Sequence, residues 1–333
     1  MTTSSVAAAP QSRWNDTLHK ALNSNLLPII AALIIVSVAL SVMTPAFLTA
    51  SNLTNIVTQS AVVGIAAIGA TFVIITSGID LSVGSNIALS GMIGAIVAQS
   101  TGNGFFGIAT VIVVAAVVGA FNGIAVSWLR LAPFIVTLAT LGMARGLTLQ
   151  ISQGQSVYSL PESLNWLGAS AIFDVKTSAL VTVVLFVIAH FVLSRTTFGH
   201  RIYAVGGNAE AARLAGINVR GVVFSAYVIA GVAAGIAALI LLGRLDSATP
   251  NAATGTELQV IAAVVIGGTS LFGGKGSMVG TFVGVLLIGV INNGLTLLNV
   301  SSFWVQFVQG ALIFLAVLLD SVNTRRRARQ SGS

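Results

Sequence analysis

Side chains that can do acid–base, nucleophilic or metal chemistry are scarce in this sequence. Its 333 residues include 8 Asp and Glu, 3 His and no Cys. The lack of cysteine excludes disulfides, thiol catalysis and thiolate metal sites. His190 has no second histidine or carboxylate at a spacing that suits a shared metal ion. We therefore expect no catalytic residue, no metal site and no cofactor.

One glycine-rich segment, Gly273–Ser277, superficially resembles a phosphate-binding loop. Such a loop needs Ser or Thr directly after its Gly-Lys pair and a further glycine near its start. Here Gly276 follows Lys275, and Thr269 occupies the earlier glycine position. The chain is therefore not expected to hydrolyse a nucleotide itself.

The elements that position the few polar side chains are predicted to be membrane helices. The sequence is 56% hydrophobic and 7% charged, with a mean hydropathy of +0.98, whereas soluble domains carry about 25% charged residues. Crossing ~30 Å of hydrocarbon takes roughly 20 apolar residues in a helix. Runs near this length lie at 26–43, 60–77, 84–99, 105–127, 132–150, 177–193, 222–242, 257–272, 278–297 and 302–320. They predict an all-α polytopic protein of about ten transmembrane helices.

The basic residues predict how these helices are oriented. With a cytoplasmic N-terminus, only Lys176 and Arg244 fall on the outer side, which fits the positive-inside rule. The cytoplasmic junctions receive Arg130, Arg195, Arg201, Arg213, Arg220, Lys275, Arg325, Arg326, Arg327 and Arg329.

This placement also predicts the domain organisation and explains the net charge. We expect a cytoplasmic tail at 1–25, a membrane domain at 26–320 and a basic cytoplasmic tail at 321–333. The charge of +7 follows from this topology, so the lipid bilayer is the expected partner and nucleic acid is not. The expected location is a bacterial inner membrane.

Two segments share the pattern Gly-x-acid-Leu-x-Val, namely Gly78–Val83 and Gly255–Val260. Further along, Asn122-Gly123 and Asn293-Gly294 follow in the same order. The copies are five predicted spans apart, so they would have opposite orientations in the membrane. Chance similarity between glycine-rich apolar sequences is the alternative. An inverted repeat with polar breaks in corresponding positions is typical of transporters.

Ionisable side chains at membrane depth are costly, so they are candidates for function. Arg145 follows Phe134, Thr137 and Thr140 in the fifth predicted span. It would line a cavity, snorkel to the membrane surface or pair with Glu162.

We add to these four residues the two asparagines of the possible repeat, Asn122 and Asn293. The candidates for the translocation pathway are thus Phe134, Thr137, Thr140, Arg145, Asn122 and Asn293. Asp80 and Glu257 lie at predicted helix starts, where a carboxylate complements the helix dipole, and are interpreted as structural or gating residues.

Glycines recur at every fourth residue in three places: Gly119 and Gly123, Gly231 and Gly235, and the series Gly276, Gly280 and Gly284. Small residues at this spacing let helix backbones approach closely. We interpret them as packing seams rather than binding sites.

The longest predicted cytoplasmic connection between spans is the loop 194–221. Within it Asn208 can cap a helix, Glu210 suits its first turn and Gly216 can supply its left-handed end. A helix of about two turns is not stable alone. It is either an ordinary surface helix or one that docks against another subunit.

The same segment carries a family resemblance. Glu210-Ala211-Ala212 with Gly216 resembles the Glu-Ala-Ala-x-x-x-Gly element of ATP-binding-cassette importer permeases. Four further blocks are similar to ribose-type sugar permeases: Ser77–Gly84, Phe198–Asn208, Ile261–Gly276 and Asn292–Leu295. Gly255–Gln259 departs from the Gly-Tyr-Glu-Leu-Asp pattern of that type, which leaves the sugar open.

The resemblance implies a permease that moves a monosaccharide, ribose or a related sugar, into the cytoplasm by alternating access. It implies a homodimer that works with an ABC ATPase subunit and a periplasmic sugar-binding protein. The residues it assigns to ATPase coupling are Asn208, Glu210, Ala211, Ala212, Arg213 and Gly216. The alternatives are a branched-chain amino-acid or nucleoside importer and, from another class, an ion-coupled secondary transporter.

Overall fold

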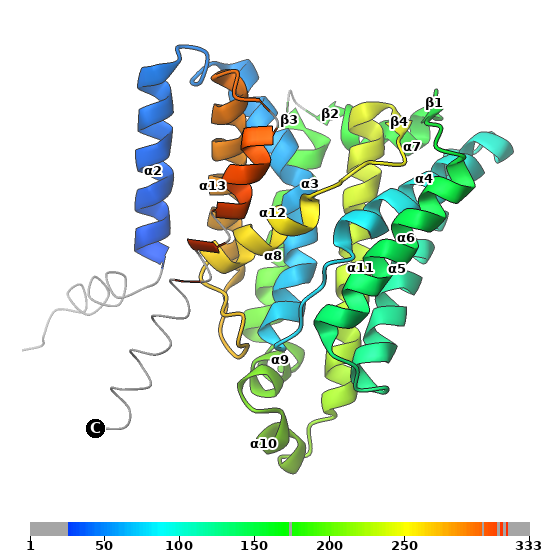
Figure 1. The fold of residues 1–333 in the computed structure, drawn as a ribbon, viewed down its shortest axis with the longest axis vertical. Helices are drawn as coiled ribbons and strands as arrows, with labels where there is room; N and C mark the ends of the chain where they lie inside the picture. The colour runs from blue at the N-terminus through cyan, green and yellow to red at the C-terminus, as the bar shows by residue number, and fades with distance from the viewer. Residues whose placement is uncertain (1–25, 173–174, 302, 312–313, 316–317, 319–333) are drawn as a thin grey trace, which may run out of the picture.

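The computed structural model describes residues 26–172, 175–301, 303–311, 314, 315 and 318, most of them helical. Among these residues, eight helices are long and apolar enough to cross a membrane. They form one bundle (Figure 1) and comprise α2 (Leu26–Met43), α3 (Ala50–Ile75), α4 (Val83–Thr101), α5 (Gly104–Ser127), α6 (Pro133–Ser152), α8 (Thr177–Arg195), α11 (Val219–Leu245) and α13 (Met278–Leu297). The prediction of a mostly helical chain with many membrane spans is confirmed.

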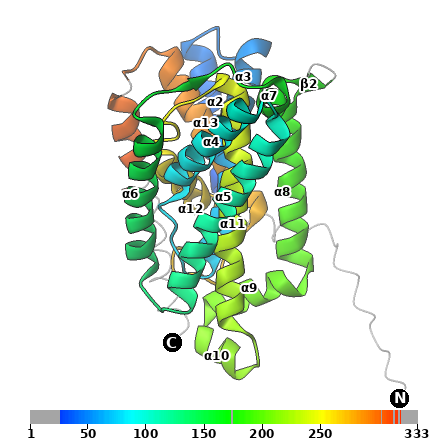
Figure 2. The same ribbon diagram turned by 90° about the vertical axis from the view of Figure 1, so that its right-hand side faces the viewer.

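Shorter elements join these helices. They are α7 (Glu162–Ala169), α9 (Thr197–Gly207), α10 (Ala209–Leu214) and α12 (Thr256–Ile266), with the strands β1 (Val157–Tyr158), β2 (Ala171–Ile172), β3 (Val175–Lys176) and β4 (Ser247–Ala248). β1 pairs with β4 and β2 with β3, both antiparallel. Figure 2 shows α9 lying across one end of the bundle with α10 beyond it, and we call this the α10 end.

The predicted eighth span at 257–272 is wrong, because α12 has 11 residues and ends at Ile266. At 1.5 Å per residue it covers about 16 Å, half of the hydrocarbon thickness. The chain turns after it because Gly268 adopts a left-handed φ of 88° and donates its N–H to the Val265 carbonyl. The apolar run at 257–272 thus contains a helix that crosses only about half of the hydrocarbon layer.

The tenth predicted span, 302–320, falls partly outside the described residues, of which 303–311 are helical. The predicted tails at 1–25 and 321–333 also lie outside them. The second predicted span is longer than expected, because α3 begins at Ala50, where the Thr49 side chain accepts a hydrogen bond from the Asn52 N–H.

Two non-helical segments interrupt the bundle. The first break, residues 76–82, separates α3 from α4, and the second break, residues 246–255, separates α11 from α12. In Figure 1 both α4 and α12 begin inside the bundle rather than at one of its ends. Backbone of this kind is tolerated at membrane depth only where protein or a watery cavity surrounds it.

Helix α11 forms the centre of the bundle and packs on α3, α4 and α5. Most residues of α3, α4 and α11 are buried, whereas most residues of α2, α5 and α6 are not. The outward-facing Val, Ile, Leu and Phe side chains of α5 and α6 mark the surface that meets lipid or another subunit.

The predicted glycine seams are packing contacts. A Cβ added at Gly231 of α11 would lie 2.5 Å from the Ala115 carbonyl oxygen and 2.9 Å from the Gly119 Cα of α5. A Cβ at Gly284 of α13 would overlap the Ala263 carbonyl of α12. Two seams that the sequence presents separately, on α5 and α11, are therefore the two sides of one helix contact.

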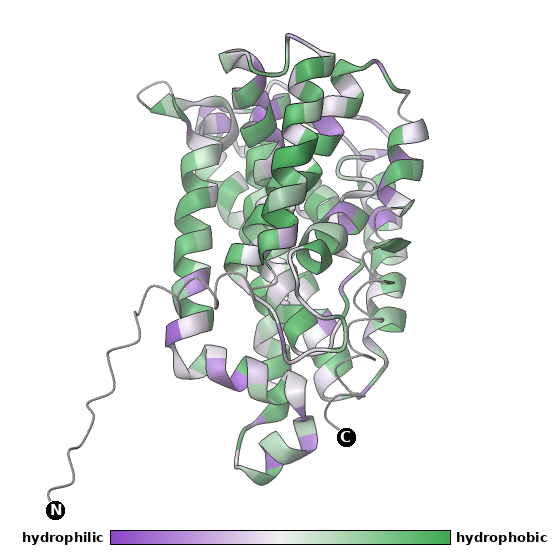
Figure 3. Cartoon of the chain, turned by 90° about the vertical axis from the view of Figure 1, so that its left-hand side faces the viewer, coloured by the Kyte–Doolittle hydropathy of each residue, from purple (hydrophilic) through white to green (hydrophobic). Residues whose placement is uncertain are grey.

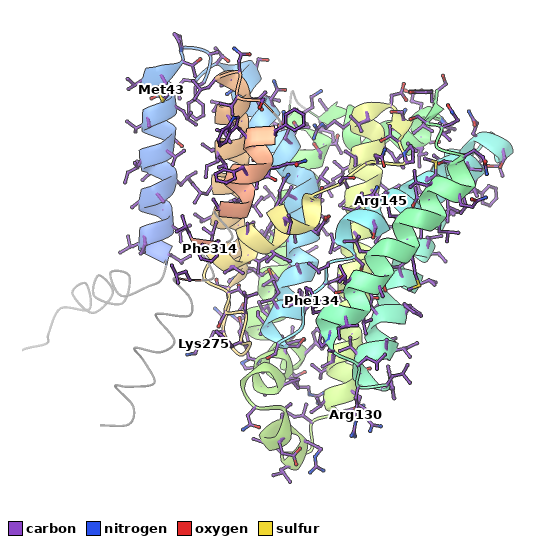
Figure 4. All side chains as sticks on the ribbon, in the orientation of Figure 1. Met43, Arg130, Phe134, Arg145, Lys275 and Phe314 are labelled. Atoms are coloured by element: carbon purple, nitrogen blue, oxygen red, sulfur yellow. The ribbon has the colours of Figure 1, made fainter. Side chains whose placement is uncertain are left out.

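Hydrophilic residues gather mostly toward the two ends of the bundle (Figure 3). Arg130 and Lys275 lie toward the α10 end, and Met43 lies at the opposite end (Figure 4). Arg195 ends α8 just before α9. The described basic residues that the sequence assigns to the cytoplasm thus share one end, while Arg244 lies in the last turn of α11 at the other.

Candidate functional site

Helix α10 forms as its sequence predicts. The Asn208 side chain accepts a hydrogen bond from the Ala211 N–H at 2.9 Å, and Gly216 has a left-handed φ of 80°. The N–H groups of Gly216 and Ile217 donate hydrogen bonds to the carbonyls of Arg213 and Ala212, respectively. A six-residue helix is therefore held by its caps at both ends.

Glu210 and Arg213 form a two-pronged ion pair on the surface of α10, with Nε 3.2 Å from Oε1 and Nη2 2.5 Å from it. The hydrogen bonds and charge of Arg213 lower the pKa of Glu210, and Glu210 raises the pKa of Arg213. Both side chains are mostly exposed. The pair gives α10 a fixed charge pattern that faces outward.

Most of α10 is not covered by the rest of the chain. Ala212 is 4% exposed, whereas Leu214 is 76% exposed and Ala211 is also exposed. An apolar side chain that projects from a short charged helix suits contact with another protein. Glu210 and Arg213 also border a cavity of about 490 Å³ that reaches Ser77 and Gly78 of the first break.

Helix α9 connects α10 to the interior of the bundle. A Cβ at Gly206, in its last turn, would overlap the Ile75 carbonyl at the end of α3 and would lie 2.7 Å from the Gly274 N. The Ser77 hydroxyl donates to the Phe272 carbonyl at 3.0 Å and lies 3.3 Å from the Gly206 carbonyl. Four segments therefore meet here: α3, the first break, α9 and the loop between α12 and α13.

A second bond supports this junction. The Tyr203 hydroxyl of α9 donates to the Gly276 carbonyl at 2.8 Å. Burial raises the pKa of Tyr203, which keeps the phenol protonated as a donor.

The first break is held by a buried chain of polar side chains from three elements. The Ser82 hydroxyl donates to Asp80 at 2.6 Å, Asn122 of α5 donates to the Ser82 hydroxyl at 2.9 Å, and Thr140 of α6 donates to Asn122 at 2.6 Å. All four side chains are at most 6% exposed. The Thr137 hydroxyl lies 3.1 Å from the Ile79 carbonyl of the same break.

Arg145 holds the second break. One of its terminal nitrogens donates to the carbonyls of Pro250 at 2.7 Å and Ala252 at 3.0 Å. The pairing with Glu162 raised from sequence is thus replaced by backbone carbonyls, which no charge pattern reveals. Glu257 lies in the first turn of α12, and its charge also acts on Arg145.

Each break contacts the helix that follows the other break. A Cβ at Gly84, in the first turn of α4, would overlap the Glu257 carboxylate and would lie 2.5 Å from the Ala253 carbonyl oxygen. Ile79 and Leu81 of the first break pack on Ile261 of α12. Asp80 and Glu257 therefore belong to adjoining segments.

Two predicted pathway residues lie apart from this centre. Phe134 is 52% exposed on α6, and Asn293 exchanges two hydrogen bonds, of 2.8 and 3.0 Å, with Asn52 of α3. Thr137, Thr140, Asn122 and Arg145 contact the breaks, as described above. Their assignment to a translocation pathway stays a prediction.

Sequence reasoning missed a polar cavity of about 310 Å³ beside the second break. Gln259, Asn292 and Gln309 line it and are linked by hydrogen bonds of 3.4 and 3.1 Å. One signal could have indicated it: amide side chains in otherwise apolar helices, one of them at the repeat position of Ser82.

Replacing Asn122 by alanine should destabilise the bundle. The hydroxyls of Ser82 and Thr140 would lose their link across three elements while remaining buried, at a cost of about 1–3 kcal/mol. Thr110→Val is the control, because the hydrogen bond of the Thr110 hydroxyl lies within α5, to the Phe106 carbonyl. Equal thermal unfolding midpoints for the two purified variants would contradict the prediction.

Broken helices inside an apolar bundle, joined to a capped and exposed helix at one end, define the membrane subunit of a transport system. The chain belongs to the family described as branched-chain amino acid transport system / permease component, whose model matches residues 52–317. The resemblance to ribose-type permeases is confirmed by individual relatives.

The chain is 41% identical to the ribose import permease protein RbsC of Escherichia coli K12 over 297 residues, 88% of this chain and 92% of that protein. It is 43% identical to RbsC of Bacillus subtilis over 86% of this chain and 90% of the relative. It is 40% identical to the D-allose transport system permease protein AlsC of E. coli K12 over 86% and 88%. No solved structure is significantly similar to the chain.

Proposed function

We propose that this chain is the membrane-spanning subunit of an ATP-binding-cassette importer that carries ribose or a related monosaccharide into a bacterial cell. The relatives named for ribose and D-allose support the sugar. The observation that carries the role in ATP-driven transport is α10: a capped helix, exposed at Ala211 and Leu214, and joined through α9 to the end of α3 and to the α12–α13 loop. The α10 end is then the cytoplasmic side, where both chain ends would lie.

In this proposal α10 docks on a separate ATPase subunit. Movement of α10 on ATP binding would pull α9, whose Gly206 abuts the end of α3 and the loop before α13. Both helix breaks would then shift together, because α4, which follows the first break, meets the second break at Gly84. Access would alternate between the two sides around the breaks, one in each half of the inverted repeat that we propose.

The opposite end of the bundle would receive the sugar from a periplasmic binding protein. Helix α7, the β2–β3 hairpin and the end of α11 lie there. A homodimer would match the two nucleotide sites of the ATPase pair, and the outward apolar faces of α5 and α6 offer surface for a second copy.

Bulk or reversed charge on α10 tests this proposal. Ala211→Trp and Arg213→Glu should each reduce sugar uptake at least tenfold and weaken ATPase copurification, because a docked helix tolerates neither a steric block nor a second negative charge beside Glu210. Ala171→Trp on β2 and Lys176→Glu on β3 make the same changes at the other end of the bundle and should leave ATPase copurification normal. Normal uptake in both α10 variants would contradict the coupling role.

An ion-coupled transporter would behave differently. Proteoliposomes that hold this chain alone should show no sugar uptake under a proton or sodium gradient. Uptake there without an ATPase subunit would favour the ion-coupled class.

A further inference from the structure

The cavity beside the second break lies between α3, α11, α12, α13 and the helical residues 303–311. Its volume is about 310 Å³, which at ~30 Å³ per water equals about ten waters and admits a monosaccharide ring. The polar residues that line it are Gln59, Ser60, Arg244, Thr256, Gln259, Asn292, Thr296 and Gln309. Arg244 lies in the last turn of α11, away from α10, so the cavity reaches toward the proposed outer side.

The lining has the chemistry of a site for a neutral polyol. Amide side chains donate and accept hydrogen bonds at the same time, as sugar hydroxyls do. Arg244 is the charged residue in the lining, and no carboxylate borders the cavity in the described part of the chain. An amino acid would bring an ammonium group with no anionic partner, which is costly to desolvate.

The amide side chains keep hydrogen-bonding groups that are free to bind a ligand. Gln309 donates to the Asn292 oxygen at 3.1 Å, and Asn292 donates to the Gln259 oxygen at 3.4 Å. In the described residues, the Gln259 nitrogen and the Gln309 oxygen carry no hydrogen bond of their own. One end of the chain can therefore donate to a ligand and the other can accept from it.

The first half of the bundle contains the same hydrogen-bond order in a closed form. Thr140 donates to the Asn122 oxygen at 2.6 Å and Asn122 donates to the Ser82 hydroxyl at 2.9 Å. Ser82, Asn122 and Thr140 are at most 4% exposed. There the outer partners are short hydroxyl side chains, and the helices close around them.

In the second half both outer partners are glutamines. Gln259 occupies the place of Ser82 after its helix break, and Gln309 occupies the place of Thr140 one helix beyond the asparagine. The bonds are longer, and a cavity borders all three amides. The longer side chains of Gln259 and Gln309 explain why the second set of residues borders a cavity, whereas the set of Ser82, Asn122 and Thr140 is closed.

We propose that Gln259, Asn292 and Gln309 bind the sugar in transit and that the two glutamines determine which sugars pass. This rests on the proposed function. The first-half set of Ser82, Asn122 and Thr140 is the structural counterpart and holds its break in place.

The test transfers the first-half residues to the second half in the assembled importer. Gln259→Ser with Gln309→Thr should lower maximal D-ribose uptake about tenfold, the order expected for two lost hydrogen bonds, and change the ratio of D-ribose to D-allose uptake. ATPase copurification should stay normal. Gln150→Ser, on the exposed face of α6, is the control.

A second readout uses the lack of cysteine in the chain. A single Thr296→Cys at the cavity should react with a soluble maleimide more slowly in millimolar D-ribose, whereas Thr101→Cys, exposed at the end of α4, should not change. Unprotected Thr296→Cys together with a normal uptake ratio in the glutamine variant would overturn the site. The proposed function would survive that outcome if Ala211→Trp still blocked uptake.

Discussion

Replacing Gly206 by alanine is expected to reduce sugar uptake by about tenfold to a hundredfold. The added methyl group would overlap the Ile75 carbonyl at the end of α3, and the Gly274 backbone lies on the same side. Backbone atoms cannot rotate away as a side chain can, so α9 must move. Overpacking of this kind costs about 1–3 kcal/mol, and each ~1.4 kcal/mol in a barrier is a factor of ten in rate.

The neighbouring residue provides the control. A Cβ at Gly207, also in the last turn of α9, would have no atom within 4 Å. Gly207→Ala should therefore retain uptake, and the slight gain in helix propensity should not harm it. Measurements on membrane vesicles at matched expression decide the comparison. Equal uptake by the two variants would mean that the α9 junction does not transmit movement.

The local structure of α10 could be predicted because it follows local rules. Asn208 caps the helix, Glu210 lies in the first turn and Gly216 closes the end, as the sequence indicates. Each of these effects involves residues close together in the chain. Most spans could also be predicted, because the thickness of the hydrocarbon layer sets the length of any apolar helix that crosses it.

The end of α12 could not be predicted from hydropathy. The residues after Ile266 remain small and apolar enough to resemble a continuing span, and the turn depends on the left-handed backbone of Gly268. The partners of Arg145 were also hidden, because Pro250 and Ala252 contribute carbonyls rather than side chains. Hydropathy and charge patterns depend on the side chains, so they do not predict where the backbone of a distant segment will lie.

The sequence repeat and the hydrogen bonds pair Asn122 with different asparagines of α13, one residue apart. The sequence matches Asn122 with Asn293, whereas Asn292 makes the corresponding bonds. One residue turns a helical side chain by about 100°, so Asn293 faces α3 and pairs with Asn52 instead. Motif similarity located the right turn of α13 but not the right face.

Replacing Gly84 by alanine should block transport while leaving the ATPase partner attached. Gly84 lies where the first turn of α4 meets the second break, and an added Cβ would overlap the Glu257 carboxylate and lie 2.5 Å from the Ala253 carbonyl. Two halves that must move past each other would be pushed apart. We expect uptake to fall about tenfold or more, from the same overpacking cost of about 1–3 kcal/mol.

Gly91→Ala is the control on the same helix, because its Cβ would meet the Leu242 side chain at an ordinary 3.7 Å. Since α10 lies away from this contact, Gly84→Ala should keep ATPase copurification and ATP hydrolysis, whereas Gly206→Ala should disturb the link between hydrolysis and uptake. Uptake by Gly84→Ala equal to that of Gly91→Ala would mean that α4 and the second break need not stay in close contact. Movement at α10 would then have to reach the sugar through the segments that α9 contacts directly, which include α3, α8, α11 and the α12–α13 loop.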